Sequence, residues 1–209
     1  MIELYTWTTP NGRKATIALE EMGLAYNVHT VNITKDEQFE PAFLQISPNN
    51  RIPAIVDADG PDGQPVSVFE TGAILLYLAE KTGQFMPTDS RKKIAVYEWL
   101  MWQMGGYGPM LGQAHHFLRY NVGKAPYAEE RYRNETLRLY GVLDRRLAGN
   151  EFVAGDEYSI ADMAIYPWTA RHEWHQAPLD DFAHVKRWYD QLGQRPAVQK
   201  GMDTPPVQN

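Results

Sequence analysis

The sequence predicts a small α/β domain followed by an all-helical domain, and two observations carry this prediction. Over residues 1–83, short apolar runs alternate with stretches of helical periodicity in the order β-α-β-α-β-β-α. From residue 91 onward the periodicity is that of long helices, and no run favours a strand. We therefore expect an α/β domain at 1–83, a linker at 84–90 and a helical domain at 91–209.

The α/β domain should open with a strand, a helix and a second strand. Residues 2–6 are apolar and aromatic, which favours a strand, and residues 8–12 favour a turn. Residues 27–32 predict the second strand. The helix between the strands should bury one face, which contains Ala15, Ala18, Leu19 and Met22. Because a helix connects them, the two strands should lie parallel.

The same domain should close with a hairpin and a helix. A short helix is expected at residues 41–44. Residues 53–57 and 66–69 predict strands, and the turn-forming segment 59–63 between them favours an antiparallel hairpin. The helix that follows would end at Gly83, since glycine commonly terminates helices.

The second domain should consist of helices alone. They are expected at residues 91–118, at 126–148, after a capping-box pattern at 159–162, and at 181–192. Three glycines and a proline at 105–109 predict a kink or break in the first of them. The tail after Pro196 is polar, and we expect it to be loosely held.

The composition narrows the class of protein. With 44% hydrophobic and 22% charged residues, the chain resembles an ordinary soluble protein, and its net charge of −6 argues against nucleic-acid binding. The sequence contains no run of 18 apolar residues, so we expect no membrane span. The first residues lack the features of a signal peptide. We therefore expect a cytoplasmic protein with no membrane partner.

The absence of cysteine excludes protein-borne thiol chemistry. The sequence contains no cysteine, so disulfides and thiolate metal sites cannot form. The i, i+3 spacing of His172 and His175 would let both bind one metal ion from a helix, but no third ligand is evident. The side chains of the adjacent His115 and His116 would point in different directions on a helix and chelate poorly. We expect no metal site. Any sulfur chemistry must use the sulfur of a ligand.

The segment 47–83 carries two features that suggest ligand binding. Pro53 stands at the entrance of an expected strand, where it removes a backbone donor and can adopt the cis form. Glu70 and Thr71 stand where a strand passes into a helix, so a carboxylate and a hydroxyl lie beside a helix N-terminus. Taken alone, this pair is equally well explained as a helix cap.

These elements and motifs resemble the cytosolic glutathione transferase superfamily across essentially the whole chain. The motifs are SPNNRIPAIVD, FETGAILLYLAEKTG and YSIADMAIYPW. Other segments, including TTPNGRKATIALEE and WLMWQMGGYGPMLGQAHHF, are similar to the bacterial nu class, whose members reduce disulfide bonds with glutathione. The resemblance implies a thioredoxin-like N-terminal domain, an all-α C-terminal domain, glutathione as co-substrate and a homodimer.

The resemblance also assigns glutathione-binding residues within the central segment. The superfamily's Ile-Pro pair matches Ile52 and Pro53, with a cis proline and the Ile52 backbone paired to the cysteinyl part of glutathione. Its acid and hydroxyl pair matches Glu70 and Thr71, which would hold the γ-glutamyl end. Arg51 could reach a ligand carboxylate or could simply lie at the surface.

Four further residues follow from the similarity to the nu class. Thr9 and Asn11 match residues beside the glutathione sulfur, and Gln38 and Arg131 match residues that contact the tripeptide. The tyrosine or serine that activates glutathione in other classes has no clear match, since Tyr5 lies within an expected strand.

The implied chemistry uses the sulfur of glutathione as a thiolate. At the N-terminus of the first helix, the dipole stabilises an anion by about 0.3–1 kcal/mol. Hydrogen bonds from Thr9 and Asn11 would add to this. The thiolate would attack a substrate disulfide, and a second glutathione would resolve the mixed disulfide.

Two other functions remain open at this point. The chain could be a conjugating transferase or an organic hydroperoxide peroxidase. It could also be a regulatory protein that binds glutathione without turnover, because Ile52-Pro53 and Glu70-Thr71 indicate ligand binding and not chemistry. Turnover of small disulfides, conjugation substrates and hydroperoxides would separate the three functions.

Overall fold

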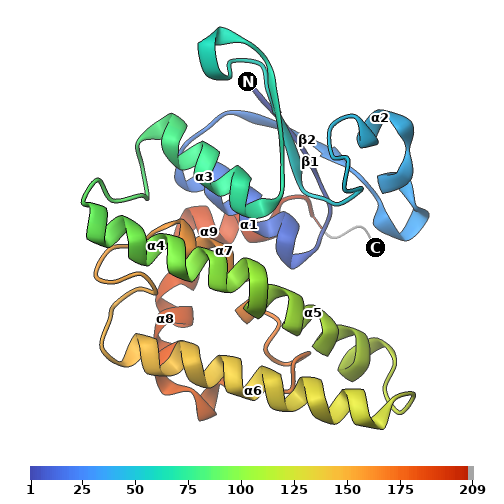
Figure 1. Cartoon of the computed structure of the whole chain (residues 1–209), viewed down its shortest axis with the longest axis vertical. Coiled ribbons are helices and arrows are strands. Elements are labelled where there is room, and N and C mark those ends of the chain that lie inside the picture. The colour runs from blue at the N-terminus through green and yellow to red at the C-terminus, as the bar shows by residue number, and fades with distance from the viewer. Residues whose placement is uncertain (207–209) are drawn as a thin grey trace. The chain divides into compact units, whose positions relative to one another are not determined.

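A computed structural model describes residues 1–206 and groups the chain into two compact units. The first contains Met1–Gln84 together with the segment that begins at Arg195, and the second is Phe85–Gln194. Figure 1 colours the chain from its N-terminus to its C-terminus and labels the longer helices and some of the strands of the two units. The first unit is the expected α/β fold with one added helix, and the second is built from helices.

A four-stranded mixed sheet forms the centre of the first unit. Its strands are β1 (Ile2–Thr6), β2 (Tyr26–Thr30), β3 (Ala54–Asp57) and β4 (Val66–Phe69). The order is β2-β1-β3-β4, with β1 parallel to β2 and antiparallel to β3, and with β3 antiparallel to β4. The predicted parallel pair and hairpin are both confirmed.

The helices of the first unit follow the predicted order. They are α1 (Pro10–Glu21), α2 (Pro41–Leu44) and α3 (Thr71–Thr82), with short 3-10 turns at Ile33–Lys35, Glu37–Phe39 and Pro61–Gly63. Gly83 ends α3 in the left-handed conformation, with φ of 67°, as its position predicts.

The turn predicted at residues 8–12 is wrong in its second half, because α1 already begins at Pro10. Thr9 caps the helix, and its hydroxyl oxygen accepts a hydrogen bond from the Gly12 nitrogen at 3.1 Å. Pro10 suits the first helical position, where no donor is needed. A side chain at Gly12 would lie 2.2 Å from the Trp7 carbonyl oxygen, so only glycine fits this close approach.

The second unit contains the expected helices and two π-helical turns. Its elements are α4 (Ser90–Trp102), π turns at Gln103–Tyr107 and His116–Tyr120, α5 (Gly108–His115), α6 (Pro126–Ala148), α7 (Ile160–Thr169), a 3-10 turn at Leu179–Asp181 and α8 (Ala183–Gly193). The chain stays helical through residues 105–109, where we expected a kink or break. Pro109 has no N–H to donate, and the Gly108 N–H bonds to the Gln103 carbonyl in the wider π pattern.

The predicted capping box of α7 is confirmed and extends into the core. The Ser159 hydroxyl caps the helix, and the buried Asp162 carboxylate accepts a hydrogen bond from the Ser159 nitrogen at 3.0 Å. The same carboxylate accepts from the Val153 nitrogen and from Trp188 Nε1, both at 2.9 Å. A local cap therefore also joins α7 to α8.

Two buried histidines lie in the aromatic core of the second unit. The rings of His115 and His175 stack with centroids 4.6 Å apart, and His175 Nδ1 lies 3.0 Å from the Tyr140 hydroxyl. Burial lowers the pKa of His115 to about 4, and the nearby Arg171 charge acts in the same direction. Burial likewise holds the pKa of His175 well below its usual value. Both rings are therefore neutral in the folded protein at pH 7.

The prediction of a loosely held tail after Pro196 is wrong at Pro196–Asp203, which form helix α9, and its last residues, 207–209, lie outside the described part of the chain. Thr16 on α1 donates a hydrogen bond to the Gly201 carbonyl at 2.6 Å, and Val198 is buried. Arg195 makes a bidentate ion pair with Glu21, at 2.6 and 2.8 Å. We expected residues 196–209 in the helical domain, whereas α9 groups with the first unit because it packs on α1. None of the helices within residues 1–206 is both long and apolar enough to cross a bilayer.

Candidate functional site

A hollow of about 230 Å³ lies in the first unit, where three segments meet. These are the start of α1, the loop before β3 and the junction of β4 with α3. The lining residues are Asn11, Asn49, Arg51, Ile52, Pro53, Glu70 and Thr71. All except Asn49 are among the site residues predicted from the sequence. The fold brings them together from positions up to sixty residues apart.

The loop before β3 presents its backbone at the hollow. The Ile52–Pro53 peptide bond is cis, as the resemblance implies. Ile52 packs against a buried cluster of Val31, Phe43 and Ala54, and the Ser47 hydroxyl donates to the Arg51 carbonyl at 2.8 Å. These contacts fix the loop from below and leave the exposed Arg51 side chain on the rim.

The Glu70 side chain does not cap the helix that it precedes. Its backbone has φ of 68° and ψ of 124°, which residues other than glycine seldom adopt. No side-chain cap hydrogen bond forms, and Glu70 Oε1 instead accepts from Asn49 Nδ2 at 3.1 Å. This geometry disfavours the simple capping explanation and leaves a carboxylate at the edge of the hollow.

Beneath the hollow lies a buried lysine that the sequence analysis missed. Lys14 is 2% exposed, and its Nζ donates to the Thr71 hydroxyl oxygen at 3.3 Å. Burial lowers the pKa of Lys14 well below its usual value, while the Glu70 carboxylate opposes that shift. A lysine beside Ala15 in an amphipathic pattern predicts a solvent-facing residue, so the sequence alone offers no signal for this role.

Thr9 and Asn11 stand together at the N-terminus of α1. The Thr9 hydroxyl accepts from Gly12, which leaves its own hydrogen to donate, and no bond from that hydrogen forms within residues 1–206. Pro10 carries no N–H and the Gly12 N–H is taken, so side-chain donors matter more here than backbone groups. The first turn contains no acidic residue that would repel an anion.

Gln38 and Arg131 do not line this hollow. Gln38 lies in the 3-10 turn at Glu37–Phe39, where it is 9% exposed, and its Oε1 has no hydrogen-bond partner among the described residues. Arg131 lies on α6 in the second unit.

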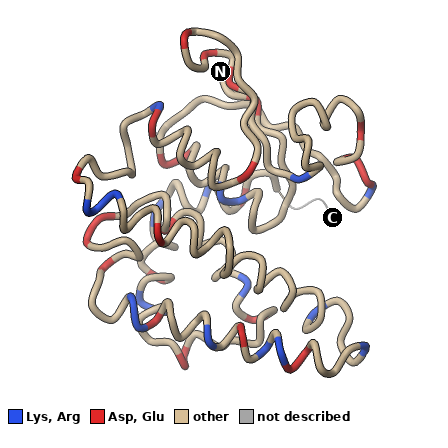
Figure 2. Tube along the Cα trace, in the orientation of Figure 1, with Lys and Arg blue, Asp and Glu red and all other residues tan. Residues whose placement is uncertain are grey.

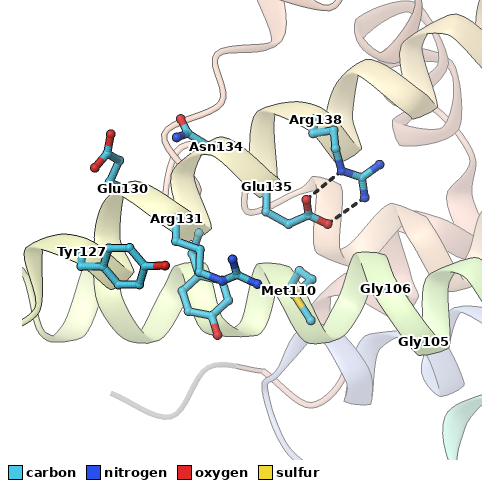
Figure 3. A pocket seen from close by; sticks show the side chains of 10 residues that line it. Gly105, Gly106, Met110, Tyr127, Glu130, Arg131, Asn134, Glu135 and Arg138 are labelled. Atoms are coloured by element: carbon cyan, nitrogen blue, oxygen red, sulfur yellow. Dashed lines mark hydrogen bonds and ion pairs between the residues drawn. The ribbon is translucent and has the colours of Figure 1, made fainter.

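Arg131 lines a larger pocket of about 710 Å³ within the second unit. In Figure 3 its side chain extends from α6 toward the helix that carries Met110. Arg138 and Glu135 form a bidentate ion pair on the same wall, with both distances at 2.7 Å. Among the described residues the Arg131 guanidinium makes no such pair, so it remains a cation that an anionic ligand could contact.

The charged groups of both units are scattered along the chain, as Figure 2 shows, and do not gather into one basic stripe. Within residues 1–206, no three His, Asp or Glu side chains are arranged to hold a metal ion. The functional groups available for chemistry at the first-unit hollow are therefore amide, hydroxyl, carboxylate and ammonium groups.

Comparison with known proteins assigns both parts of the chain to one family. Residues 8–81 match the family model for the glutathione S-transferase N-terminal domain, and residues 100–196 match that for its C-terminal domain. The chain belongs to the glutathione S-transferase family. The predicted family and its fold class, a thioredoxin-like domain followed by a helical domain, are thereby confirmed.

Two curated relatives lie within this family. The disulfide-bond oxidoreductase YfcG of Escherichia coli is 51% identical over 201 residues, covering 95% of this chain and 93% of the relative. The disulfide-bond oxidoreductase YghU of the same species is 42% identical over 214 residues, which cover 96% of this chain and 73% of the relative. These relatives agree with the predicted similarity to glutathione transferases of the bacterial nu class.

Solved glutathione transferases share the fold closely. An enzyme from Pseudomonas putida, with one glutathione disulfide bound per subunit, has a TM-score of 0.92 and 45% identity over 98% of this chain and 91% of its own. An enzyme from Burkholderia graminis, with two glutathione molecules bound per subunit, has a TM-score of 0.91 and 44% identity. The match covers 98% of this chain and 88% of that enzyme.

Proposed function

We propose that this glutathione transferase is a glutathione-dependent disulfide reductase. The observation that carries the proposal is the first-unit hollow, which gathers Asn11, the cis Ile52-Pro53 bond and the Glu70-Thr71 pair around one space. The names of the two Escherichia coli relatives, both disulfide-bond oxidoreductases, support the same activity. A homodimer and a cytoplasmic location are also proposed, from family membership alone.

Each part of glutathione has a complementary group in the hollow. The Glu70 carboxylate would accept from the γ-glutamyl ammonium, and Thr71 would contact the neighbouring carboxylate. The Ile52 backbone, next to the cis bond, would pair with the cysteinyl backbone, as a strand pairs with its neighbour. Arg51 on the rim would bind the glycyl carboxylate. Gln38 and Arg131 are proposed as further glutathione contacts.

The sulfur would lie at the start of α1. There the Thr9 hydroxyl and the Asn11 side-chain amide would donate hydrogen bonds to it, and the helix dipole would favour the anion. These donors lower the pKa of the bound thiol, so more thiolate is present at neutral pH. Thiolate is the species that attacks a disulfide.

Two exchange steps complete the reaction. The glutathione thiolate attacks one sulfur of the substrate disulfide, forming a mixed disulfide and releasing the other sulfur as a thiolate that takes a proton from water. A second glutathione thiolate then attacks the glutathione sulfur of the mixed disulfide. The second substrate thiol leaves, and oxidised glutathione remains. Every sulfur comes from a ligand, which agrees with a chain that has no cysteine.

The proposal is tested by turnover of hydroxyethyl disulfide with glutathione, with oxidised glutathione measured through a coupled reductase. We expect Thr9→Ala and Asn11→Ala each to lower kcat by about 10–100-fold, since each removes one donor to the thiolate and so lowers the fraction of bound glutathione that is ionised. Glutathione affinity, measured by calorimetry, should fall by much less. Thr9→Ser keeps both the cap and the donor, so it should retain most of the activity.

Three outcomes would contradict the proposal. Glutathione binding without disulfide turnover would favour the regulatory alternative. Faster conjugation of chlorodinitrobenzene, or faster reduction of an organic hydroperoxide, would favour the other enzymes of the family. Equal losses of kcat and affinity in Thr9→Ala and Asn11→Ala would make these residues binding groups only.

A further inference from the structure

We propose that Lys14 is a positioning residue that makes the first-unit hollow selective for the α-carboxylate of the γ-glutamyl group. It would act through Thr71, whose hydroxyl it holds, and through its own charge beneath the hollow. This inference rests on the proposed function only in needing glutathione as the ligand.

Lys14 is connected to the hollow through Thr71. Lys14 lies on α1, three residues after Asn11, and is buried, whereas Thr71 lines the hollow. An ammonium group has donors and no acceptor, so Lys14 must donate to Thr71 Oγ1 across their 3.3 Å contact. The O–H bond of Thr71 is then directed away from Lys14. One buried contact thus restricts the orientation of a hydroxyl that lines the hollow.

The charges on the two sides of the junction are opposite. Glu70 presents a carboxylate at the rim, and Lys14 places a buried ammonium behind the next residue, Thr71. The amino-acid end of the γ-glutamyl group is itself a zwitterion. Its ammonium fits the carboxylate of Glu70, and its carboxylate fits Thr71 with the ammonium of Lys14 behind it. The pair therefore fixes the direction in which a zwitterion binds.

The burial of the Lys14 charge also favours an anion bound at Thr71. A buried cation is costly unless a negative charge compensates it. Burial already lowers the pKa of Lys14, and the Glu70 carboxylate, on an exposed side chain, opposes that shift. A ligand carboxylate bound at Thr71 would add negative charge close to Lys14. Binding of the ligand would thus stabilise the charged form of this lysine.

A purely structural role for Lys14 makes a different prediction, so ligand analogues can separate the two. Lys14→Met keeps most of the length of the side chain and removes its charge. Calorimetry should compare glutathione with 4-aminobutanoyl-cysteinylglycine, which keeps the amine and lacks the α-carboxylate. We expect Lys14→Met to weaken glutathione binding about tenfold or more and to change binding of the analogue by less than about twofold. Lys35→Met, at an exposed lysine of the same unit, should change neither.

Two further variants keep the test decisive. Lys14→Arg retains the charge and should recover part of the lost glutathione affinity. Should Lys14→Met fail to fold, Lys14→Gln, which keeps a polar side chain and removes the charge, should show the same selective loss for glutathione over the analogue. Equal weakening of both ligands, or no weakening of either, would overturn the inference. The disulfide turnover assay decides the proposed function separately, because this experiment measures binding alone.

Discussion

Glu70 has a side chain that does not cap the helix it precedes. With φ of 68° and no cap hydrogen bond, it gives up the ordinary role of a residue at that position. A non-glycine residue in such a conformation costs on the order of 1–3 kcal/mol and persists only where its surroundings determine it. Asn49 holds the carboxylate in place, at 3.1 Å. Under the proposed function, Glu70 serves glutathione binding at some expense to the helix.

Replacement of Glu70 by glutamine tests this role at the residue scale. Glu70→Gln keeps the shape and removes the charge, so the charge-assisted bond to the ligand ammonium becomes a neutral one. We expect glutathione affinity to fall by about 10–100-fold, equivalent to about 1.5–3 kcal/mol, as measured by calorimetry. The melting temperature should fall only slightly, since the carboxylate does not cap α3 and acts on the buried Lys14 charge from an exposed side chain, where water screens it. Glu80→Gln, at an exposed position of the same helix, is the matched control, and a similar loss of affinity there would contradict the assignment.

Single residues of the hollow differ in how well the sequence predicts them. Two motifs of the hollow are predicted by residues adjacent in the sequence. They are the strand-entry proline, with Ile52 and Pro53, and the strand-to-helix junction, with Glu70 and Thr71. Lys14 could not be found in this way. Its buried hydrogen bond is with Thr71, fifty-seven positions away in the chain, and a single helix pattern contains no information about such a contact.

At the scale of elements, α9 shows why a helix can escape sequence analysis. Its residues, PAVQKGMD, are few and partly polar, and a helix of this length is marginal by propensity alone. Packing on α1 stabilises it, through the buried Val198 and the close approach at Gly201. By contrast, the long helix α6 was predicted at its true bounds because five buried residues recur along one face: Thr136, Leu139, Tyr140, Leu143 and Leu147.

The contact between α9 and α1 can be tested at Gly201. A Cβ added there would lie 2.6 Å from the Ile17 Cα, a backbone atom that cannot turn aside. We expect Gly201→Ala to lower the free energy of unfolding by about 1–3 kcal/mol, the usual cost of overpacking, as measured by urea denaturation. Gly149→Ala has nothing within 4 Å of the added Cβ and serves as the control. Unchanged stability in Gly201→Ala would show that the two helices do not approach so closely.

At the scale of the whole molecule, the stacked histidines of the second unit should make the fold sensitive to acid. The pKa of His115 is about 4 in the folded protein and about 6.5 in a model peptide, so the unfolded chain binds more protons between these values. The stability that the neutral ring confers is complete above pH 6.5 and is lost as the pH falls toward 4. His175, whose pKa burial also lowers, acts in the same direction.

The matching measurement is the free energy of unfolding at a series of pH values. Between pH 7 and 4 we expect wild type to lose about 3 kcal/mol more than His115→Phe, in which this titration is absent. His184→Phe, at an exposed histidine, should keep the wild-type pH dependence. Identical slopes for wild type and His115→Phe would mean that the ring titrates normally in the folded protein.

The arrangement of α9 on α1 also bears on how the protein is made. A polypeptide leaves the ribosome from its N-terminus, and domains generally fold as they emerge. Thr16 and Gly201, which bond to each other, are 185 residues apart, and the whole of the second unit lies between them. During synthesis, the surface of α1 that α9 covers must therefore stay open until the helical unit has been translated. The helix whose N-terminus carries Thr9 and Asn11 therefore receives α9 as a packing partner only after the whole second unit has been translated.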